Sequence, residues 1–588
     1  MRGAGASQRG PRSRGWFVSD RPDFRVRGAW LVLAFGAMAV AVFGRLAQVQ
    51  LLQGGWLAAR AAAEQTTSIS LPGYRGSILD REGRVLVSNQ TVYDVFADPS
   101  LVDPSQRDQV AAEVAPVLKV SAGKIREALA QHTQFVYLAR RQLEDVNTRL
   151  KALDLAGIGT IPTQRRVYTP SPLPGTSFAA NLLGFVNADS AGQYGLEAYY
   201  DSLLRGVDGR ESTLVDLLGN AIVLGKEQKR PAQNGDDLQL GLDSQIQYWA
   251  ELALAKGVAD AQAASGTLMI MDPHTGSVRA WAQYPSYNAD NYGASSLSSF
   301  RDLAVSDVYE PGSVMKVVTF AGGLDNHAIT PDTVVDERQS VIDGVLIHDW
   351  DNRSHGNVTM QTVLDDSLNN GAIKVMQLEG RSAFYSNLLA FGIGAPTGID
   401  LAGEVNQPVA PEASWRDLTY AEASFGQSVV ATPVEMLAAL NTVANGGVWV
   451  QPHVVDAVIN PNTGTRTAVA PIARRVMPAD TAATLAQMMV GVVDHRGAEG
   501  FKAQIPGYKG EIAGKTGTAS VVVHGRYGGD VIASFMGFMP VQNPQFTMMV
   551  ILRYPHENKV PRFGALLAAP VWNDVARIMI DQWRIGRR

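Results

Sequence analysis

The first part of the chain contains one long uncharged stretch, which predicts a membrane-spanning helix. Gly28–Gly44 carries no charge and has arginines on both sides. At about 1.5 Å per residue the stretch reaches about 26 Å, and its flanks extend it to the roughly 30 Å of a bilayer core. The seven arginines in residues 1–27 predict a cytoplasmic tail and an extracytoplasmic remainder. We assign residues 28–46 to an uncleaved signal anchor, since the stretch is long for a cleaved signal peptide.

Residues 47–240 mix helical and strand patterns and predict an elongated α/β module. An alanine-rich helical pattern up to Thr66 predicts a stalk. Apolar alternation and glycine turns in Leu71–Leu86 predict two strands, with Arg75, Asp80 and Arg81 available as an ion network. The remaining patterns predict short amphipathic helices over 103–155, a further helix over 195–204, and Pro- and Gly-rich linkers at 161–176 and 231–236.

Residues 241–588 predict an α+β domain. A strand, a long helix and a hairpin come first, and a three-stranded antiparallel meander with an amphipathic helix comes last, at 513–523, 531–539, 546–554 and 564–584. Segments from both ends of the domain would therefore build one antiparallel sheet, with a large helical insertion between them. Chemistry is expected in a cleft between the sheet and the helical part.

Composition excludes several classes of function. With 46% hydrophobic and 18% charged residues over 588 positions, the chain is too apolar to be disordered or fibrous and long enough for several domains. A formal charge of -5 gives no electrostatic footprint for nucleic acid, so no nucleic-acid partner is expected. The absence of cysteine excludes disulfides, thiolate zinc sites and cysteine nucleophiles.

The first candidate motif pairs a nucleophile with a base. Ser313 and Lys316 stand three residues apart after a Pro-Gly turn, so on a helix they share one face. A desolvated lysine loses enough pKa to take the serine proton, and the helix N-terminus favours the negative charge that develops. The pair alone is weak, because the same spacing occurs in many solvated helices.

Two further motifs are each weak alone. Ser367 and Asn369 offer a hydroxyl for proton relay and an amide for positioning a substrate, although Asn370 or its neighbours could simply cap the next helix. In the other motif, a strand places a cation, two hydroxyls and a glycine in sequence: Lys515, Thr516, Gly517 and Thr518. Such an edge strand suits a carboxylate and an added extended peptide, whereas the plain alternative is an ordinary strand with a polar face.

Together, the order Ser-x-x-Lys, Ser-x-Asn, Lys-Thr-Gly is the signature of penicillin-recognising acyl enzymes. From Thr267 onward the chain resembles the transpeptidase domain of a class B penicillin-binding protein. Additional agreeing segments are Asp272–Gly276, Pro285–Asn288, Gly426–Ser428 with Thr432 and Pro433, and Gly514. The earlier segments Arg75–Gly83 and Gly195–Glu197, with Tyr200, Leu204 and Gly206, resemble the non-penicillin-binding module of that class.

The resemblance implies a fold and an activity. The fold would be an antiparallel sheet with helices on both faces and a helical subdomain, preceded by a pedestal and a membrane anchor. Ser313 would attack the peptide bond between the terminal D-alanines of a peptidoglycan stem peptide, and β-lactams would acylate the same serine. Lys316 would be the base, Ser367 and Asn369 would relay and position, and Lys515, Thr516 and Thr518 would hold the carboxylate.

The same resemblance implies the surroundings of the enzyme. The Ser313 and Thr518 N–H groups would form the oxyanion hole, and no cofactor or metal would be needed. Partners would be a SEDS-family membrane glycosyltransferase and other divisome or elongation membrane proteins. The resemblance favours the division branch over the elongation branch, because the segment Val334–Gly356 contains no cysteine for the metal site of some elongation enzymes. We interpret the segment as a polar loop, and the alternative is a metal site at its Asp and His residues: His348, Asp349, Asp351 and His355. The sequence departs from the division pattern at Gly497–Gly500, where Gly-Thr is more usual, and in the short Val521–Asp530 hairpin.

Other functions fit the sequence less well. A β-lactamase would need the Glu-x-x-Leu-Asn loop, which is absent between Ser367 and Lys515, and a bifunctional synthase would need a glycosyltransferase domain, which residues 47–237 do not show. A membrane penicillin sensor would need more than a 27-residue cytoplasmic tail. A scaffold without turnover would have little use for the retained Ser313, Lys316 and Lys515.

Overall fold

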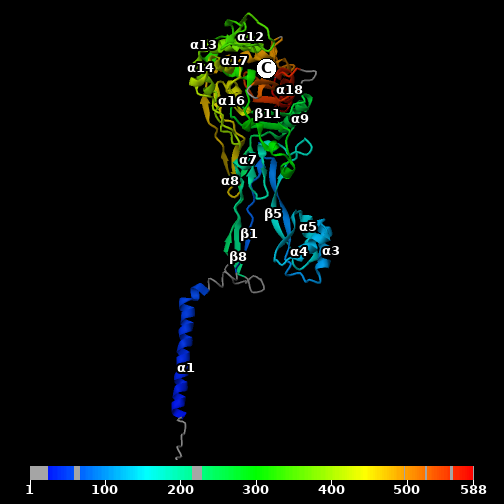
Figure 1. The fold of residues 1–588 in the computed structure, drawn as a ribbon, viewed down its shortest axis with the longest axis vertical. Helices are drawn as coiled ribbons and strands as arrows, with labels where there is room; N and C mark the ends of the chain where they lie inside the picture. Colours follow the sequence, from blue (N-terminus) through cyan, green and yellow to red (C-terminus); the bar gives the residue numbers. More distant parts are fainter. Residues whose placement is uncertain are drawn as a thin grey trace, which may run out of the picture. The chain divides into compact units, whose positions relative to one another are not determined.

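The protein is described by a computed structural model that covers residues 24–57, 66–214, 228–495, 497–523, 526–556 and 561–586. Its contacts divide it into two compact units (Figure 1). The first unit consists of residues 1–71 and 209–231, and the second of residues 72–208 and 232–588.

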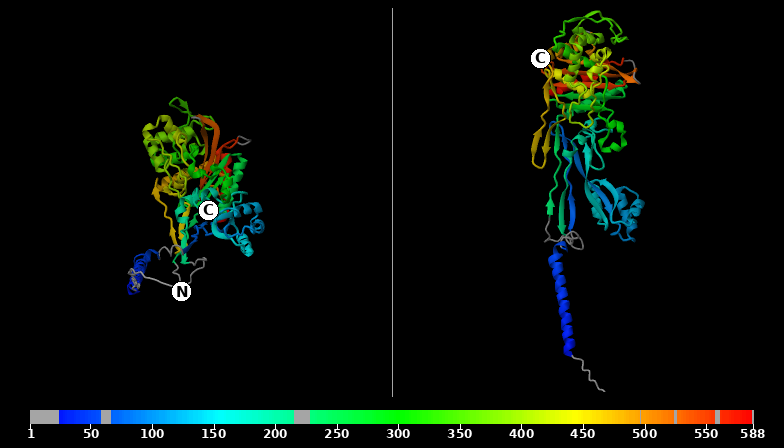
Figure 2. Two further views of the ribbon diagram at one scale, coloured as in Figure 1. Left: turned by 60° about the horizontal axis from the view of Figure 1, so that its bottom comes forward. Right: turned by 60° about the vertical axis from the view of Figure 1, so that its left-hand side comes forward.

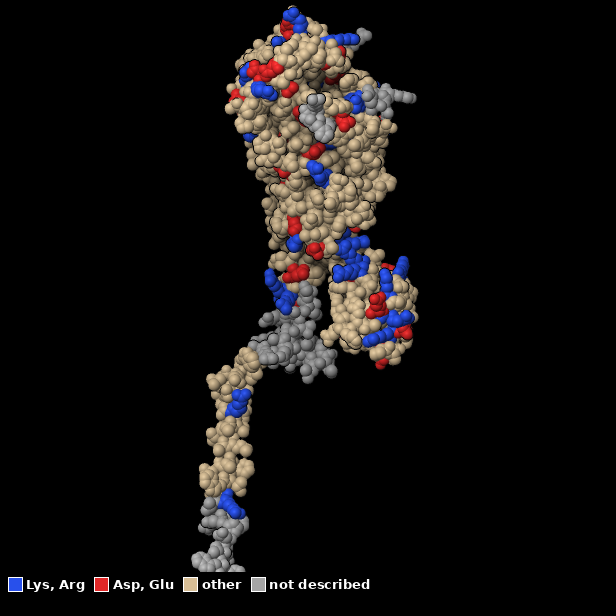
Figure 3. All heavy atoms as spheres, in the orientation of Figure 1, with Lys and Arg blue, Asp and Glu red and all other residues tan. Residues whose placement is uncertain are grey.

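The first unit contains the predicted anchor and a small sheet. Helix α1 spans Phe24–Ala47, and Arg27–Leu52 is long and apolar enough to cross a membrane, with a mean hydropathy of 1.9. None of its 18-residue apolar window is buried, and Figure 3 shows no charged side chain along the middle of the visible face. Such a surface is suited to lipid rather than to water. The sheet pairs β1 (Thr66–Leu71), β8 (Gly209–Leu214) and β9 (Gln228–Arg230).

The helical stalk expected up to Thr66 is only partly found. After α1 the backbone forms a π-helical turn over Gln48–Leu52 and a short helical turn over residues 54–57. Residues 58–65 lie outside the described part of the chain, and the strand β1 begins at Thr66.

The second unit contains a seven-stranded mixed sheet with a small helical lobe. The order is β19-β18-β10-β2-β3-β4, with β5 also on β3. The bounds are β2 Ile78–Leu79, β3 Val85–Ala97, β4 Val136–Gln142, β5 Ile158–Tyr168, β10 Asp237–Leu240, β18 Val455–Asn460 and β19 Thr465–Ala468. Because β18 and β19 come from the C-terminal half, this sheet crosses the boundary expected near residue 240. That boundary stays a prediction.

The lobe corrects two expectations from the sequence. The short helices predicted over 103–155 are α3 (Arg107–Leu118), α4 (Ala122–Leu129) and α5 (Glu144–Leu153), and they enclose a separate small core. The sequence did not predict the strand β4, which lies between α4 and α5. The predicted linker at 161–176 is wrong in its first part, since β5 pairs with β3 from Ile158 to Tyr168. Pro162 misled the prediction: β5 has β3 as its described partner, and an edge strand tolerates proline.

A buried ion cluster joins distant parts of this unit. Glu197 is fully buried at the start of the short helices α7 (Gly195–Tyr199) and α8 (Asp201–Leu204), and its carboxylate pairs with Arg75 at 2.6 Å and Arg166 at 2.7 Å. Arg75 also pairs with Asp201 at 2.7 Å. The sequence suggested a local network instead.

The members of that expected local network have other partners. Asp80 accepts hydrogen bonds from the backbone and side chain of Arg84, and Arg81 lies 3.4 Å from Asp243. The partner of Asp80 thus lies within the segment, whereas Arg75 and Arg81 pair with residues more than a hundred positions away. Such distant pairing carries no local sequence signal.

The sheet of the C-terminal half is five-stranded and antiparallel, in the order β12-β11-β23-β22-β21 (Figures 1 and 2). Its strands are β11 Ser265–Met271, β12 Val278–Tyr284, β21 Ala513–Val523, β22 Arg526–Met539 and β23 Phe546–Arg553. Strands β11 and β23 pair at its centre from Ser265↔Arg553 to Met271↔Thr547. The predicted hairpin, meander and joining of the two chain segments are confirmed.

Helices cover both faces of this sheet, as predicted. Leu268 and Ile270 of β11 pack in one core with α9 (Ser244–Asp260) and α18 (Gly564–Trp583), whereas Met269 and Met271 belong to the core of the helical insertion. Alternate side chains of a strand point to opposite faces, so a strand buried on both faces is apolar throughout. The insertion contains α10 Leu303–Ser306, α11 Lys316–Asp325, α12 Met360–Asp365, α13 Asn369–Glu379, α14 Arg381–Ala390, α15 Asp417–Ser424, α16 Pro433–Ala444 and α17 Ala479–Asp494.

We expect Glu197→Gln to destabilise the second unit by about 3–5 kcal/mol, because it leaves Arg166 buried without an anion and leaves Arg75 with Asp201 alone. Thermal and denaturant unfolding of the purified protein measure the effect. The matched control is Glu82→Gln, which removes a half-exposed carboxylate that pairs with Arg84 and should change stability by less than about 0.5 kcal/mol. Equal effects of the two variants would contradict a stabilising role for the buried cluster.

Candidate active site

Three segments far apart in the sequence meet at the side chain of Ser367. The Lys316 amine donates to the Ser367 carbonyl at 2.5 Å and to the Asn369 Oδ1 at 2.9 Å, and it lies 3.4 Å from the Ser367 Oγ. From the opposite side the Lys515 ammonium donates to the Ser367 Oγ at 2.7 Å. The structure thus brings together five of the residues that the sequence nominated, counting Ser313 one helical turn before Lys316.

Ser313, the predicted nucleophile, lies on a tight turn that packs against strand β21. It belongs to a 3-10 turn over Gly312–Met315 that leads directly into α11, and it is half-buried. Gly312 has a φ of +62°, and a Cβ added there would lie 3.1 Å from the Thr518 carbonyl oxygen. The Ser313 hydroxyl makes no hydrogen bond to another described residue. The Lys316 amine donates instead to Ser367 and Asn369.

Glycine at position 517 allows the same close approach. A Cβ on Gly517 would lie 2.3 Å from the Ser534 Oγ and 3.0 Å from the Val314 Cγ1. The Ser534 hydroxyl can rotate away from such a methyl group, whereas Val314, the neighbour of Ser313, would have to shift by a few tenths of an ångström. The missing side chain therefore helps to set how near Ser313 lies to the strand.

The segment Gly426–Ser428 supports the nucleophile turn from its other side. The Gly312 N–H donates to the Gly426 carbonyl at 2.9 Å, and the Ser428 N–H donates to the Glu310 carboxylate at 2.9 Å. The backbone before Ser313 is therefore held by hydrogen bonds as well as by packing.

Lys316 has the environment of a general base. It is completely buried, and burial, followed by the nearby Lys515 cation, lowers the pKa of its amine to about 7. A neutral amine has two protons and one lone pair. The two acceptors at 2.5 and 2.9 Å, which are the Ser367 carbonyl and the Asn369 Oδ1, use the two protons and leave the lone pair free.

Asp349 fixes the Ser-x-Asn motif, and its role was not visible in the sequence. Its carboxylate accepts from the backbone N–H of Asn369, from the N–H of Asn370 at 3.3 Å and from the Asn370 side chain at 3.0 Å. The neighbouring Glu337 is fully buried, and burial with the nearby Asp349 raises the pKa of its carboxyl to about 8. Asn370 therefore braces the loop, whereas the residue before α13 is Leu368, which has no capping side chain.

The third motif lies on β21, the edge strand of the sheet, as predicted. Lys515 is fully buried, and burial lowers the pKa of its amine to about 8, opposed by the carboxylates of Glu499 and Asp365. The Thr516 hydroxyl donates to Glu499 at 2.7 Å. The Thr518 hydroxyl accepts from the Gly564 N–H at 3.1 Å and donates to no other described residue.

The three residues predicted to bind a carboxylate, Lys515, Thr516 and Thr518, differ in exposure and in the hydrogen bonds that they already make. Thr518 is partly exposed, whereas Lys515 and Thr516 are buried and already make hydrogen bonds in this state. Glu499 lies in the segment that the sequence marked only as a departure from the family pattern. Nothing in its spacing to Lys515 could have predicted the contact.

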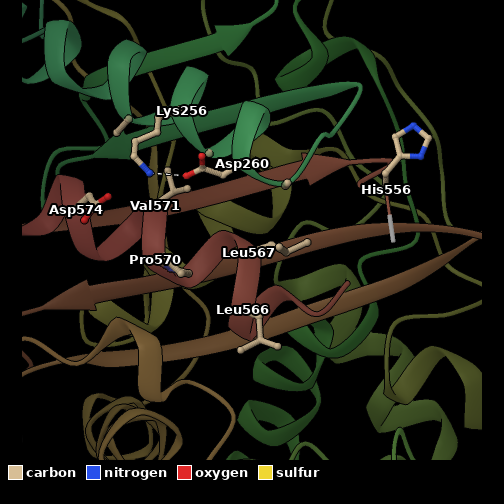
Figure 4. A pocket seen from close by; sticks show the side chains of 11 residues that line it. Lys256, Asp260, His556, Leu566, Leu567, Pro570, Val571 and Asp574 are labelled. Carbon is tan, nitrogen blue, oxygen red and sulfur yellow. Dashed lines mark hydrogen bonds and ion pairs between the residues drawn. The ribbon is translucent and has the colours of Figure 1, made fainter. Parts of the chain in front are cut away.

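A separate pocket lies on the other face of the sheet, between α9 and α18 (Figure 4). It has a volume of about 440 Å³, and Lys256 at its edge pairs with Asp260. None of the residues of the three motifs lines it. Within the described residues no group of three His, Asp or Glu side chains is arranged to hold a metal ion, and the expectation that no metal is needed stays a prediction.

The fold and the three converging motifs define a serine acyl enzyme of the penicillin-recognising class. Residues 266–577 match the family described as penicillin binding protein transpeptidase domain, and residues 70–240 match the penicillin-binding protein dimerisation domain. The chain belongs to the penicillin-binding proteins, and this pair of domains identifies class B. The predicted class and fold are confirmed.

Individual relatives agree over nearly the whole chain. The peptidoglycan D,D-transpeptidase FtsI of Escherichia coli K12 is 29% identical and covers 93% of this chain and 89% of its own length. The penicillin-binding protein PbpB of Mycobacterium tuberculosis is 30% identical over 97% of this chain and 88% of its own. The crystal structure of penicillin-binding protein 3 from Mycobacterium tuberculosis with aztreonam has a TM-score of 0.69, 25% identity, and covers 88% of this chain and 98% of its own.

We expect Gly517→Ala to lower the rate of serine acylation by about tenfold, because Val314 beside Ser313 must shift by a few tenths of an ångström and a full displacement of about 1 Å costs about a hundredfold. The second-order rate of labelling by a fluorescent penicillin measures it. Gly529→Ala is the matched control, since a Cβ at Gly529, on the neighbouring strand β22, meets nothing within 4 Å. A Gly517→Ala enzyme that labels as fast as the control would show that this contact does not position Ser313.

Proposed function

We propose that the chain cross-links peptidoglycan by a two-step acyl transfer in which Ser313 is the nucleophile and Lys316 the general base. The observation that carries these roles is the buried Lys316 amine, which has two acceptors for its protons, a pKa near neutrality and a position one turn after Ser313. Family membership supports the D,D-transpeptidase activity itself.

The first half-reaction forms an ester on Ser313. The Ser313 Oγ gives its proton to the Lys316 lone pair and attacks the carbonyl carbon between the two terminal D-alanines of a stem peptide. The backbone N–H groups of Ser313 and Thr518 stabilise the oxyanion. The carbon–nitrogen bond then breaks, and the proton passes from Lys316 through the Ser367 hydroxyl to the departing D-alanine. The distance of 3.4 Å between the Lys316 Nζ and the Ser367 Oγ supports this relay.

The second half-reaction regenerates the serine. An amine of a neighbouring stem peptide attacks the ester carbonyl, a peptide bond forms, and the amine proton returns through Lys316 to the Ser313 Oγ. Asn369 positions the donor peptide, and Thr518 with Lys515 and Thr516 binds the carboxylate. A β-lactam follows the first half-reaction, but its leaving amine stays attached, so the ester persists.

The branch and the orientation are part of the same proposal. Similarity to FtsI supports a role in septal wall synthesis, with the elongation branch as the alternative. The helix α1 supports a single-pass protein whose arginine-rich tail is cytoplasmic and whose catalytic domain is extracytoplasmic.

We expect Ser313→Ala to abolish covalent labelling by a fluorescent penicillin and Lys316→Ala to slow it by about a hundredfold or more. Labelling of the native enzyme should rise with pH through about 7, because Lys316 must lose its proton to act as base. Peptide mapping locates the label, and Ser298→Ala, at an exposed position in the short 3-10 helix Leu297–Phe300, is the control. Native-level labelling of Ser313→Ala would overturn the proposed nucleophile.

The anchor and the pedestal suggest a membrane partner. The small residues Ala37 and Ala41 are spaced four apart on α1, which lets another helix approach closely, and the anchor surface is exposed throughout the apolar window. Class B enzymes do not polymerise glycan, so we infer that a SEDS-family glycosyltransferase binds α1 and the pedestal.

We expect replacement of Gly28–Gly44 by an unrelated apolar anchor of equal length to leave penicillin labelling intact. Co-purification with the polymerase, and stimulation of the polymerase, should fall at least tenfold because the helix contact is lost. A replacement that leaves both unchanged would assign the helix to tethering alone.

A further inference from the structure

A continuous hydrogen-bond chain runs from the catalytic lysines to Glu499. The Lys515 ammonium donates to the Ser367 Oγ at 2.7 Å and to the Thr516 Oγ1 at 3.2 Å. The Thr516 hydroxyl, having accepted from Lys515, donates its own proton to the Glu499 carboxylate at 2.7 Å. Along this chain each hydroxyl accepts from Lys515, and the Thr516 hydroxyl then donates to Glu499.

The direction of these bonds requires a protonated Lys515. Besides the two hydroxyls, the Thr516 carbonyl oxygen lies 3.2 Å from the Lys515 Nζ, so this nitrogen has three acceptors. A neutral amine has two N–H donors and an ammonium has three, so only the charged form can donate to all three acceptors. The Ser367 hydroxyl then keeps its proton for a partner on the Lys316 side. A neutral Lys515 would lose one of its three donors, and the hydroxyl orientations at Ser367 and Thr516 would no longer be fixed.

We propose that Glu499 is a positioning residue for the transpeptidase reaction: through Thr516 it keeps the proton on Lys515, and the charged Lys515 in turn keeps Lys316 free to act as base. The inference rests on the proposed roles of Ser313 and Lys316. It assigns a role to Glu499, which lies in the segment where the family pattern usually has Gly-Thr.

The charges around the two lysines agree with this arrangement. Lys515 faces Glu499, from the segment before the turn at Phe501–Ala503, and Asp365, from α12. Lys515 also faces Lys316. The pKa of the Lys316 amine is lowered mainly by burial and next by the Lys515 cation. The carboxylates of Glu499 and Asp349 raise the pKa of Lys316, and Glu337 does so once it is ionised.

The surroundings of the two carboxylates near Lys515 differ. Asp365 also pairs with His495 at 2.5 Å and accepts from Gln361 at 2.8 Å, and Asp366 lies near both Asp365 and Glu499. The Glu499 carboxylate bonds to Thr516 instead. Replacing Glu499 therefore removes one charge while Asp365, Asp366 and His495 stay in place.

The proposal predicts the pH dependence of acylation. The active form has a neutral Lys316 and a protonated Lys515, so the rate rises as Lys316 loses its proton and falls as Lys515 loses its own. Without the Glu499 anion the Lys515 pKa drops, and the alkaline limb of the profile moves to lower pH by about one unit. The acid limb moves less, because the lost Glu499 charge and the reduced Lys515 charge act on Lys316 in opposite senses. The maximal rate falls as the two limbs converge.

The test is the second-order rate of fluorescent penicillin labelling from pH 5.5 to 9.5 on the full chain in detergent, with spontaneous hydrolysis of the penicillin subtracted. Glu499→Gln keeps an oxygen that can accept from Thr516 but loses the charge, and should show the shifted alkaline limb. Glu499→Asp keeps the charge and should lie between this variant and the native enzyme. Glu127→Gln, on the exposed surface of α4, removes the same charge elsewhere and should leave the profile unchanged.

Two results would overturn the proposal. An alkaline limb of Glu499→Gln that coincides with that of the native enzyme would show that the carboxylate does not hold the Lys515 proton. A rate that rises equally at every pH would show that Glu499 acts by repelling the ligand carboxylate. Thermal unfolding confirms that each variant is folded. Labelling of Ser313→Ala would contradict the proposed nucleophile. An unshifted alkaline limb in Glu499→Gln would contradict only the proposed role of Glu499.

Discussion

The pairing of β11 with β23 is the constraint on which the catalytic half depends. It joins the first and last strands of the domain across the centre of the sheet, from Ser265↔Arg553 to Met271↔Thr547. Once this register is set, β22 and β21 follow in order, and β21 becomes the edge strand that carries Lys515. The helical insertion must then return Ser313 and Ser367 to that edge, and the absent side chain of Gly517 helps to set how closely the nucleophile turn approaches.

The sequence predicted elements well where local pattern decides them. The alternation and length of the strands at 513–554, and the apolar faces of α9 and α18, were sufficient for the sheet and one of its helical layers. Prediction failed where a tertiary partner overrides a local signal. Pro162 indicated a linker, but β5 forms because β3 offers it eleven paired positions, and β4 was missed among amphipathic helices.

The site shows the same division. Ser313, Lys316, Ser367, Asn369 and the Lys-Thr-Gly strand could be named from motif order. The residues that hold them could not: Asp349 comes from an irregular polar loop, and Glu499 meets Thr516 only because α17 and β21 bring their ends together. The motif residues have a spacing that can be read from the sequence, whereas the residues that support them are brought in by the fold from segments with no fixed spacing to the motifs.

The strand β18 connects the two halves in a way that bears on biosynthesis. It pairs with β10, which in turn pairs with β2. The central sheet of the pedestal is therefore incomplete until residues 455–460 have left the ribosome. During that interval β10 has a bare edge, which is a template for wrong pairing. A chain of this design needs its N-terminal half to be kept from aggregation while most of the catalytic half is still being synthesised.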